Sequence, residues 1–110
     1  MIDNRFDDPH FIKWAKAVKV RDNFTCQICE KRGVYLHAHH KNSWDKFVEQ
    51  RFELDNGITL CDKCHTRFHE TFGYGNNTSY QFKQYQEIAE LFKSILSRPD
   101  ENVEFVEYKP

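Results

Sequence analysis

The chain has 110 residues, which is enough for one domain (1–110) with one modest core. Charged residues make up 30% of it and no apolar run approaches the length that crosses a bilayer, so we expect no membrane association. The formal net charge of −1 excludes attraction of phosphate by a strong overall field, so any phosphate must be attracted locally. Residues 1–8 contain no apolar signal core, which predicts an intracellular, cytoplasmic protein.

Residues 9–22 are predicted to form a basic helix. Pro9 suits a first turn, and apolar residues recur after it at helical spacing. The basic residues fall mostly away from this apolar stripe and can be read either as a solvated face or as a face that contacts a nucleic-acid backbone. These basic residues are Lys13, Lys16, Lys19 and Arg21.

Four cysteines form two C-x2-C pairs, Cys26 with Cys29 and Cys61 with Cys64. In a reducing compartment such pairs indicate metal ligands rather than disulfides. Four thiolates suit tetrahedral zinc, and a closed four-thiolate shell leaves no position for water, so we predict a structural zinc. The gap of 31 residues between the pairs exceeds the roughly 15–20 of a compact four-cysteine site. Most of the other candidate functional residues lie inside this gap.

Alternation over residues 33–40 predicts a strand after a turn. A long polar connection, 41–56, follows with aromatic anchors at Trp44, Phe47 and Phe52, and part of it can be helical. The Asn56-Gly57 pair predicts a turn, with a short strand at 58–60 after it.

The second half of the chain is predicted to be helical. Residues 62–72 form one helix, and 73–77 form a loop. Thr78 and Gln81 form a capping box that opens a C-terminal helix, 78–97, whose apolar stripe we interpret as core packing. The tail, 98–110, is acidic.

The histidines indicate phosphodiester hydrolysis, which requires a base that deprotonates water and positive charge on the phosphate and leaving oxygen. His39 and His40 are adjacent on an extended segment and therefore point to opposite sides, so one is a candidate metal ligand and the other a candidate base. His65 can complete the metal site from the following helix, and the Asn56 amide can fix the loop that bears the base.

Three further histidines carry weaker signals. His69 lies one helical turn after His65 and shares its face, so it is either a further ligand or a solvated residue. His10 and His37 are interpreted as surface residues without a role.

This pattern resembles the HNH endonucleases of the zinc-containing ββα-metal type. The resemblance runs from Trp14 to the end of the helix at 62–72. It rests on Val18-x-x-Arg21-Asp22-x-x-x-Cys26-x-x-Cys29, on His37-Ala38-His39-His40, and on Asn56-Gly57-Ile58-Thr59-Leu60-Cys61-x-x-Cys64-His65-x-x-x-His69. Residues 73–78, followed by an aromatic-rich helix, are similar more weakly to HNH proteins of phages and mobile introns.

The resemblance implies a role for each motif residue. His40 would be the general base, Asn56 would orient its loop, and His39 would bind the catalytic cation opposite His65, with His69 as a third ligand. Imidazole ligands make Mn²⁺, Ni²⁺ or Zn²⁺ candidates beside Mg²⁺. The products would be a 5′-phosphate and a 3′-hydroxyl.

The predicted fold is therefore a small α+β domain: a ββα-metal unit clamped by a four-cysteine zinc site (26–72), with flanking N- and C-terminal helices. The predicted function is a metal-dependent DNA endonuclease encoded by a phage or mobile element. The alternatives are a non-catalytic zinc module that binds nucleic acid, and an accessory nuclease active only with a phage partner protein.

Overall fold

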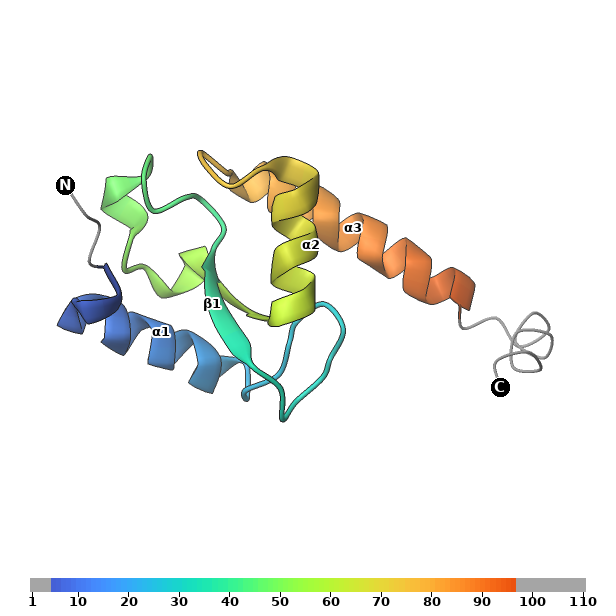
Figure 1. Ribbon diagram of the computed structural model, residues 1–110, viewed down its shortest axis with the longest axis horizontal. Coiled ribbons are helices and arrows are strands. Elements are labelled where there is room, and N and C mark those ends of the chain that lie inside the picture. The colour runs from blue at the N-terminus through green and yellow to red at the C-terminus, as the bar shows by residue number, and fades with distance from the viewer. Residues whose placement is uncertain (1–4, 97–110) are drawn as a thin grey trace.

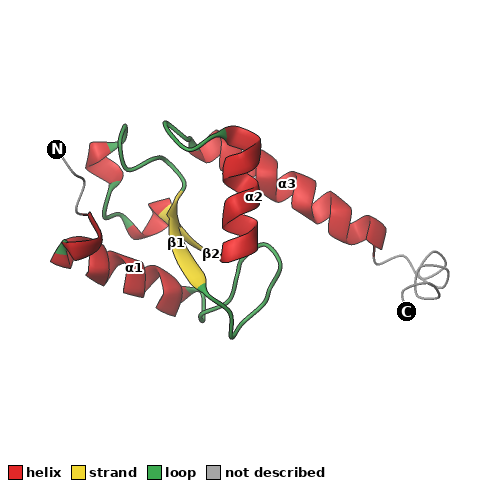
Figure 2. Cartoon of the chain, in the orientation of Figure 1, coloured by secondary structure: helices red, strands yellow, loops and turns green. Residues whose placement is uncertain are grey.

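A computed structural model describes residues 5–96 of the chain. Within that range it confirms a small α+β fold with three α-helices and one two-stranded antiparallel sheet (Figures 1 and 2). The elements in chain order are η1 (Arg5–Asp7), α1 (Pro9–Arg21), β1 (Leu36–His40), η2 (Val48–Gln50), η3 (Leu54–Asn56), β2 (Gly57–Cys61), α2 (Asp62–Phe72) and α3 (Ser79–Leu96). The predicted acidic tail, 98–110, lies outside the described residues.

The sheet separates two small apolar cores. In Figure 1, β1 lies between α1 on one side and α2 on the other, with α3 beside α2. The first core packs α1 against the sheet through Phe11, Trp14, Val18 and Trp44. The second core joins β2, α2 and α3, and its largest members are Leu60, Phe68, Phe82 and Tyr85. A two-stranded sheet is not stable by itself, so both faces depend on these helices.

Helix α1 begins and ends close to the predicted bounds, because local sequence fixes both ends. The Asp8 carboxylate caps the helix by accepting from the His10 backbone N–H at 2.8 Å, and Pro9 occupies the first turn. At the other end, the Asp22 backbone N–H donates to Val18 O at 3.1 Å and the Asn23 backbone N–H donates to Val20 O at 3.0 Å. His10 is exposed beside this cap.

Strand β1 is shorter than predicted, because its partner strand is short. The ladder pairs Leu36 with Cys61 and His40 with Gly57, so it stops where α2 begins at Asp62. Gly33, placed in the strand by the sequence pattern, instead has φ +73° in a bend. Residues 33–35 therefore lead into the strand without belonging to it.

The Asn56-Gly57 pair does not form the hairpin-type turn that its sequence predicts. Asn56 ends the 3-10 helix η3, and Gly57 is extended, with φ −111° and ψ 151°, as the first residue of β2. The glycine is needed for a different reason, since a Cβ here would lie 2.5 Å from Val18 Cγ2 and 2.6 Å from Trp14 Cζ2. Close packing of α1 on the strand explains this glycine.

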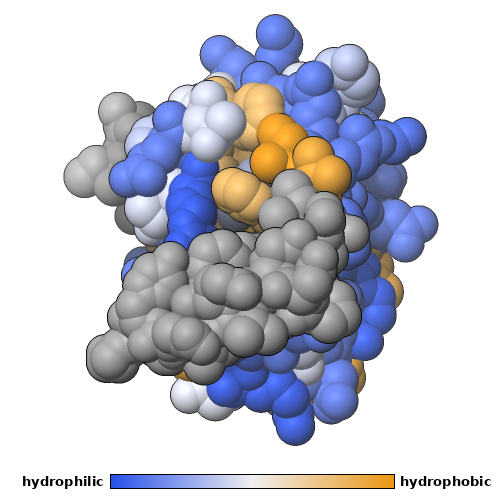
Figure 3. Space-filling model, turned by 90° about the vertical axis from the view of Figure 1, so that its right-hand side faces the viewer, coloured by the Kyte–Doolittle hydropathy of each residue, from blue (hydrophilic) through white to orange (hydrophobic). Residues whose placement is uncertain are grey.

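Helix α3 opens with the predicted capping box: Thr78 Oγ1 accepts from Gln81 N at 3.2 Å, and Gln81 Oε1 accepts from Thr78 N at 3.1 Å. Its apolar stripe packs only in part. Phe82 and Tyr85 are buried, whereas the next turns expose Ile88, Leu91 and Phe92. Figure 3, which faces the end of the molecule where α3 ends, shows hydrophobic side chains gathered on a largely hydrophilic surface.

The interpretation of the stripe as core packing was therefore wrong at Ile88 and Phe92. None of the described helices is long and apolar enough to cross a membrane.

Candidate nuclease site and metal centres

Strand β1 directs its two adjacent histidines to opposite faces, as strand geometry requires. The His39 ring lies 4.8 Å from Phe68 and 5.4 Å from Phe82, on the side of α2 and α3. The His40 ring stacks on Trp14 of α1, with centroids 3.9 Å apart and ring planes at 15°. Both residues line one cavity of about 370 Å³.

Three imidazoles meet on the His39 side. His39 comes from β1, while His65 and His69 come from one face of α2. Their ring nitrogens lie within 4.8 Å of one another, and the two Nε2 atoms of the helix pair are 3.2 Å apart. His39 Nε2 is a buried side-chain nitrogen for which the described residues supply no hydrogen-bond partner.

The loop after α2 fixes how His69 presents its nitrogen. His69 Nδ1 lies 2.8 Å from Gly73 O, and a carbonyl can only accept, so Nδ1 carries the proton. Nε2 therefore carries the lone pair, and it points toward His65. A carbonyl that holds the second nitrogen of a metal-binding histidine is the usual outer-shell arrangement in metal sites.

This cluster fits a divalent cation. Two imidazole nitrogens at about 2.0–2.1 Å from one tetrahedral ion lie about 3.4 Å apart, close to the 3.2 Å found here. Burial, followed by the neighbouring imidazoles, holds the pKa of His39 well below its ordinary value. Burial, followed by His37 and His69, lowers the pKa of His65 to about 4. Neutral imidazole is the form that binds metal.

The second half of the site surrounds His40, which is buried. Its Nε2 lies 2.8 Å from Arg51 O and must donate, so Nδ1 is left with a lone pair. Burial is the main cause that lowers the pKa of His40 to about 4. His40 is therefore a neutral imidazole with one acceptor nitrogen, which is the state that a general base needs.

Asn56 ties together the loop that follows His40. Its side-chain N–H donates to Asn42 O at 2.9 Å and to Gln50 O at 3.2 Å, and its Oδ1 accepts from Asn42 N at 2.9 Å. The Asn56 backbone carbonyl accepts from Lys41 N at 2.8 Å. One buried side chain thus joins Asn42 and Gln50, the two ends of this loop. Arg51, which follows Gln50, accepts the hydrogen bond from His40.

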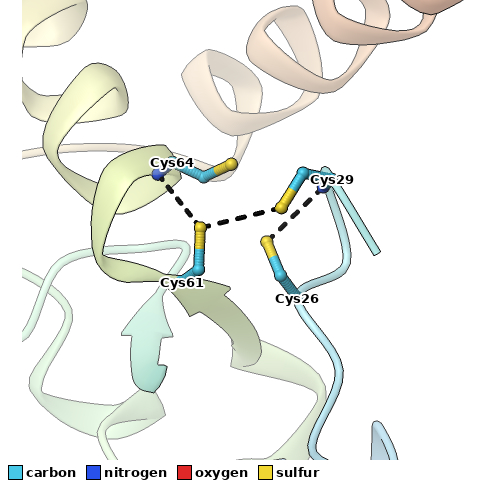
Figure 4. A group of neighbouring side chains, drawn as sticks. All are labelled: Cys26, Cys29, Cys61 and Cys64. Carbon is cyan, nitrogen blue, oxygen red and sulfur yellow. Dashed lines mark hydrogen bonds between the residues drawn. The ribbon is translucent and has the colours of Figure 1, made fainter. Parts of the chain in front are cut away.

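The four cysteines converge from distant parts of the chain (Figure 4). Cys26 and Cys29 lie on the loop after α1, Cys61 ends β2, and Cys64 lies in the first turn of α2. All four are free thiols, and their sulfurs lie within 4.8 Å of one another. They are therefore positioned to hold a metal ion.

The spacing of the sulfurs fits tetrahedral coordination. The sulfurs of Cys29 and Cys61 are 3.7 Å apart, and the edge of a tetrahedral zinc–thiolate site with bonds of ~2.3 Å is about 3.8 Å. The backbone N–H of Cys29 donates to Cys26 Sγ, and that of Cys64 donates to Cys61 Sγ. Burial opposes thiolate formation at Cys26, but backbone donors led by Cys29 lower its pKa to about 7.

Only one of the predicted DNA-contacting residues lies at the cavity. Lys19 lines it, whereas Lys13 and Lys16 are exposed elsewhere on α1. Arg21 has a structural position: its guanidinium donates to Leu54 O and Gly57 O and pairs with Asp22. The sequence pattern did not distinguish these positions, because it gave the face of the helix but not its neighbours.

His37 was interpreted as a surface residue without a role, but it belongs to the site. Its Nε2 lies 2.9 Å from Asp62 Oδ1, and its ring lies 4.4 Å from the ring of His65. The signal was present in the strand alternation, since residues two apart on a strand share a face and His37 precedes His39 by two. Tyr35 and Tyr74, which also line the cavity, were likewise missed.

Comparison with known proteins adds one match. The family model described as HNH endonuclease matches residues 26–71, which span both cysteine pairs and every histidine of the cavity. Neither the curated proteins nor the solved structures gave a significant match. HNH domains are generally those of nucleases, so the match indicates an activity on nucleic acid. Residues 26–71 of this chain, which contain both candidate metal centres, therefore match the HNH endonuclease family model.

Proposed function

We propose that this protein is a metal-dependent DNA endonuclease that leaves a 5′-phosphate and a 3′-hydroxyl. The observation that carries the proposal is one cavity with two kinds of histidine. Three imidazoles with converging nitrogens lie on one side of β1, and a neutral imidazole with a free lone pair lies on the other. A module that only binds metal would not need a buried neutral imidazole such as His40.

His39, His65 and His69 would hold the catalytic divalent cation. A cation bound there supplies positive charge to the phosphate and to the leaving oxygen. Three nitrogen ligands favour a transition ion such as Mn²⁺, Ni²⁺ or Zn²⁺ over Mg²⁺, which prefers oxygen.

His40 would act as the general base. Its Nδ1 accepts a proton from a water molecule whose oxygen attacks phosphorus, and the bond between phosphorus and O3′ breaks. The leaving O3′ then takes a proton from solvent water and becomes the hydroxyl end. The carbonyl of Arg51 orients the ring before the transfer and favours the imidazolium after it, while Asn56 keeps Arg51 in place.

The four-cysteine site would hold a structural zinc. Its ligands join the loop after α1 to the junction of β2 and α2, so zinc would fix the position of His65 one residue after Cys64. Metal binding of this kind can contribute on the order of 10 kcal/mol to folding. A closed thiolate shell has no place for a substrate, so this site would take no part in the reaction.

The test is cleavage of supercoiled plasmid DNA, and of circular single-stranded DNA, with EDTA and with added Mg²⁺, Mn²⁺ or Ni²⁺. We expect metal-dependent conversion to open-circular or linear DNA. His40→Ala and the larger His40→Gln should abolish conversion while circular dichroism and metal content stay unchanged. His10→Ala is the matched control, because His10 is exposed outside the cavity.

Unchanged cleavage by a folded His40→Gln protein would remove the base assignment. Absence of conversion with every metal, from folded and zinc-loaded protein, would favour a non-catalytic module or a nuclease that needs a partner protein. Origin in a phage or mobile element is a further part of the proposal, supported by the resemblance of residues 73–78.

A further inference from the structure

Aromatic rings form one continuous row along the histidine side of the cavity. Tyr35 packs edge-on against His37 at 4.8 Å, and His37 lies 4.4 Å from His65. His65 lies 4.6 Å from His69, and Tyr74 stacks on His69 at 4.8 Å with ring planes at 16°. All five rings line the same cavity, and the candidate metal ligands lie near the middle of the row.

The two ends of this row are large, exposed tyrosines. Tyr35 is 72% exposed and Tyr74 is 73% exposed, and neither belongs to the two apolar cores. Burying such a ring normally contributes to stability, so core packing does not explain either position. One face of Tyr74 covers His69, which leaves the other face available for a further ring.

The charge around the cavity is weak for a protein that binds duplex DNA. Arg5 and Lys19 are the basic residues that line the described cavity, and the acidic residue Asp45 lines it too. Affinity for duplex DNA comes mostly from phosphate contacts, which require many cations. Affinity for a single strand also comes from bases that stack on aromatic side chains.

We propose that the site takes an unpaired nucleic-acid strand, with Tyr35 and Tyr74 stacking nucleobases on either side of the phosphate that lies over the histidines. The inference rests on the proposed nuclease function and specifies its substrate class. Bases within a duplex are stacked on one another and cannot offer a face to either tyrosine, whereas an unpaired strand offers one at every nucleotide.

The test measures binding without cleavage. Zinc-loaded protein with no added divalent ion is titrated into a short single-stranded DNA that contains 2-aminopurine, whose fluorescence falls on stacking, and gels check that the strand stays intact. The same titration uses the matched duplex and a single-stranded RNA. We expect tighter binding and quenching with the single strands than with the duplex.

Tyr35→Ala and Tyr74→Ala should each weaken binding of the single strand about 5- to 150-fold. Tyr35→Phe and Tyr74→Phe should retain it, since the ring and not the hydroxyl stacks. Tyr80→Ala is the control, because Tyr80 is 69% exposed on α3 and does not line the cavity. Equal affinity for duplex and single strand, or alanine variants that bind like the wild type, would overturn the proposal.

Because binding is measured on strands that gels show to be intact, these outcomes are independent of the plasmid assay. Stacking without any cleavage would contradict the nuclease and keep the substrate class. Plasmid cleavage without stacking would support the nuclease and contradict the unpaired strand as its substrate class.

Discussion

Gly57→Ala is the substitution whose cost the structure specifies most directly. Gly57 is extended, so its backbone accepts any residue and the cost is purely steric. A Cβ would lie 2.5 Å from Val18 and 2.6 Å from Trp14, about 1 Å closer than ordinary contact. Val18 is fully buried, and Trp14 is held by its Nε1 hydrogen bond to Glu53 O at 2.8 Å, so neither can move freely.

Overpacking of a core usually costs about 1–3 kcal/mol, and two rigid neighbours place this variant near 3 kcal/mol. With a urea m-value of about 1.5 kcal/mol/M, the unfolding midpoint should fall by about 2 M at a fixed zinc concentration. The native-state tryptophan fluorescence, which comes from Trp14 and Trp44, should also change, since Trp14 must shift and with it the ring of His40.

Gly75→Ala is the matched control, because no atom lies within 4 Å of its added Cβ. A Gly57→Ala midpoint within roughly 0.3 M of the wild type's, equivalent to about 0.5 kcal/mol, would refute this account of the packing.

Three further predictions concern stability. Burial raises the pKa of Asp22, but the hydrogen bonds from Arg21 and Thr59 outweigh it and hold the pKa below its ordinary value. The stability that Asp22 contributes is therefore present above that ordinary value and is lost as pH falls through the lowered one, so urea titrations should show a steeper acid loss in the wild type than in Asp22→Asn. Cys26→Ser should release zinc and unfold the domain, measured by metal analysis and circular dichroism, and a folded, metal-free variant would contradict the zinc assignment. Thr78→Ala should cost about 1 kcal/mol in urea, with Ser79→Ala, outside the capping box, as its unaffected control.

Features that depend on local chemistry were predictable from the sequence. Helix α2 begins and ends at the predicted residues, 62 and 72, because its first and last turns are marked by Cys61 and Gly73. The capping box of α3 involves residues three apart, and strand alternation separated His39 from His40. The match to the HNH endonuclease family model was also predictable, because it depends on the spacing of residue types that can bind metal.

Features that depend on what an element packs against were not predictable. The length of β1 is set by the end of β2, and the role of Gly57 is set by α1. Besides the adjacent Asp22, the partners that hold Arg21 are the carbonyls of Leu54 and Gly57, more than 30 residues away in sequence.

The sequence by itself therefore determined which candidate metal ligands and which candidate base this domain carries, since ligand types and periodicity are local properties of the chain. Only the tertiary structure decided which histidines share a cavity, because that depends on the side to which α1, α2 and α3 pack. It placed the ring of His37 beside that of His65, in the cluster of candidate metal ligands, and buried His40 against Trp14. It also left two tyrosines exposed at the ends of one row of rings, a position that results from packing between elements distant in sequence.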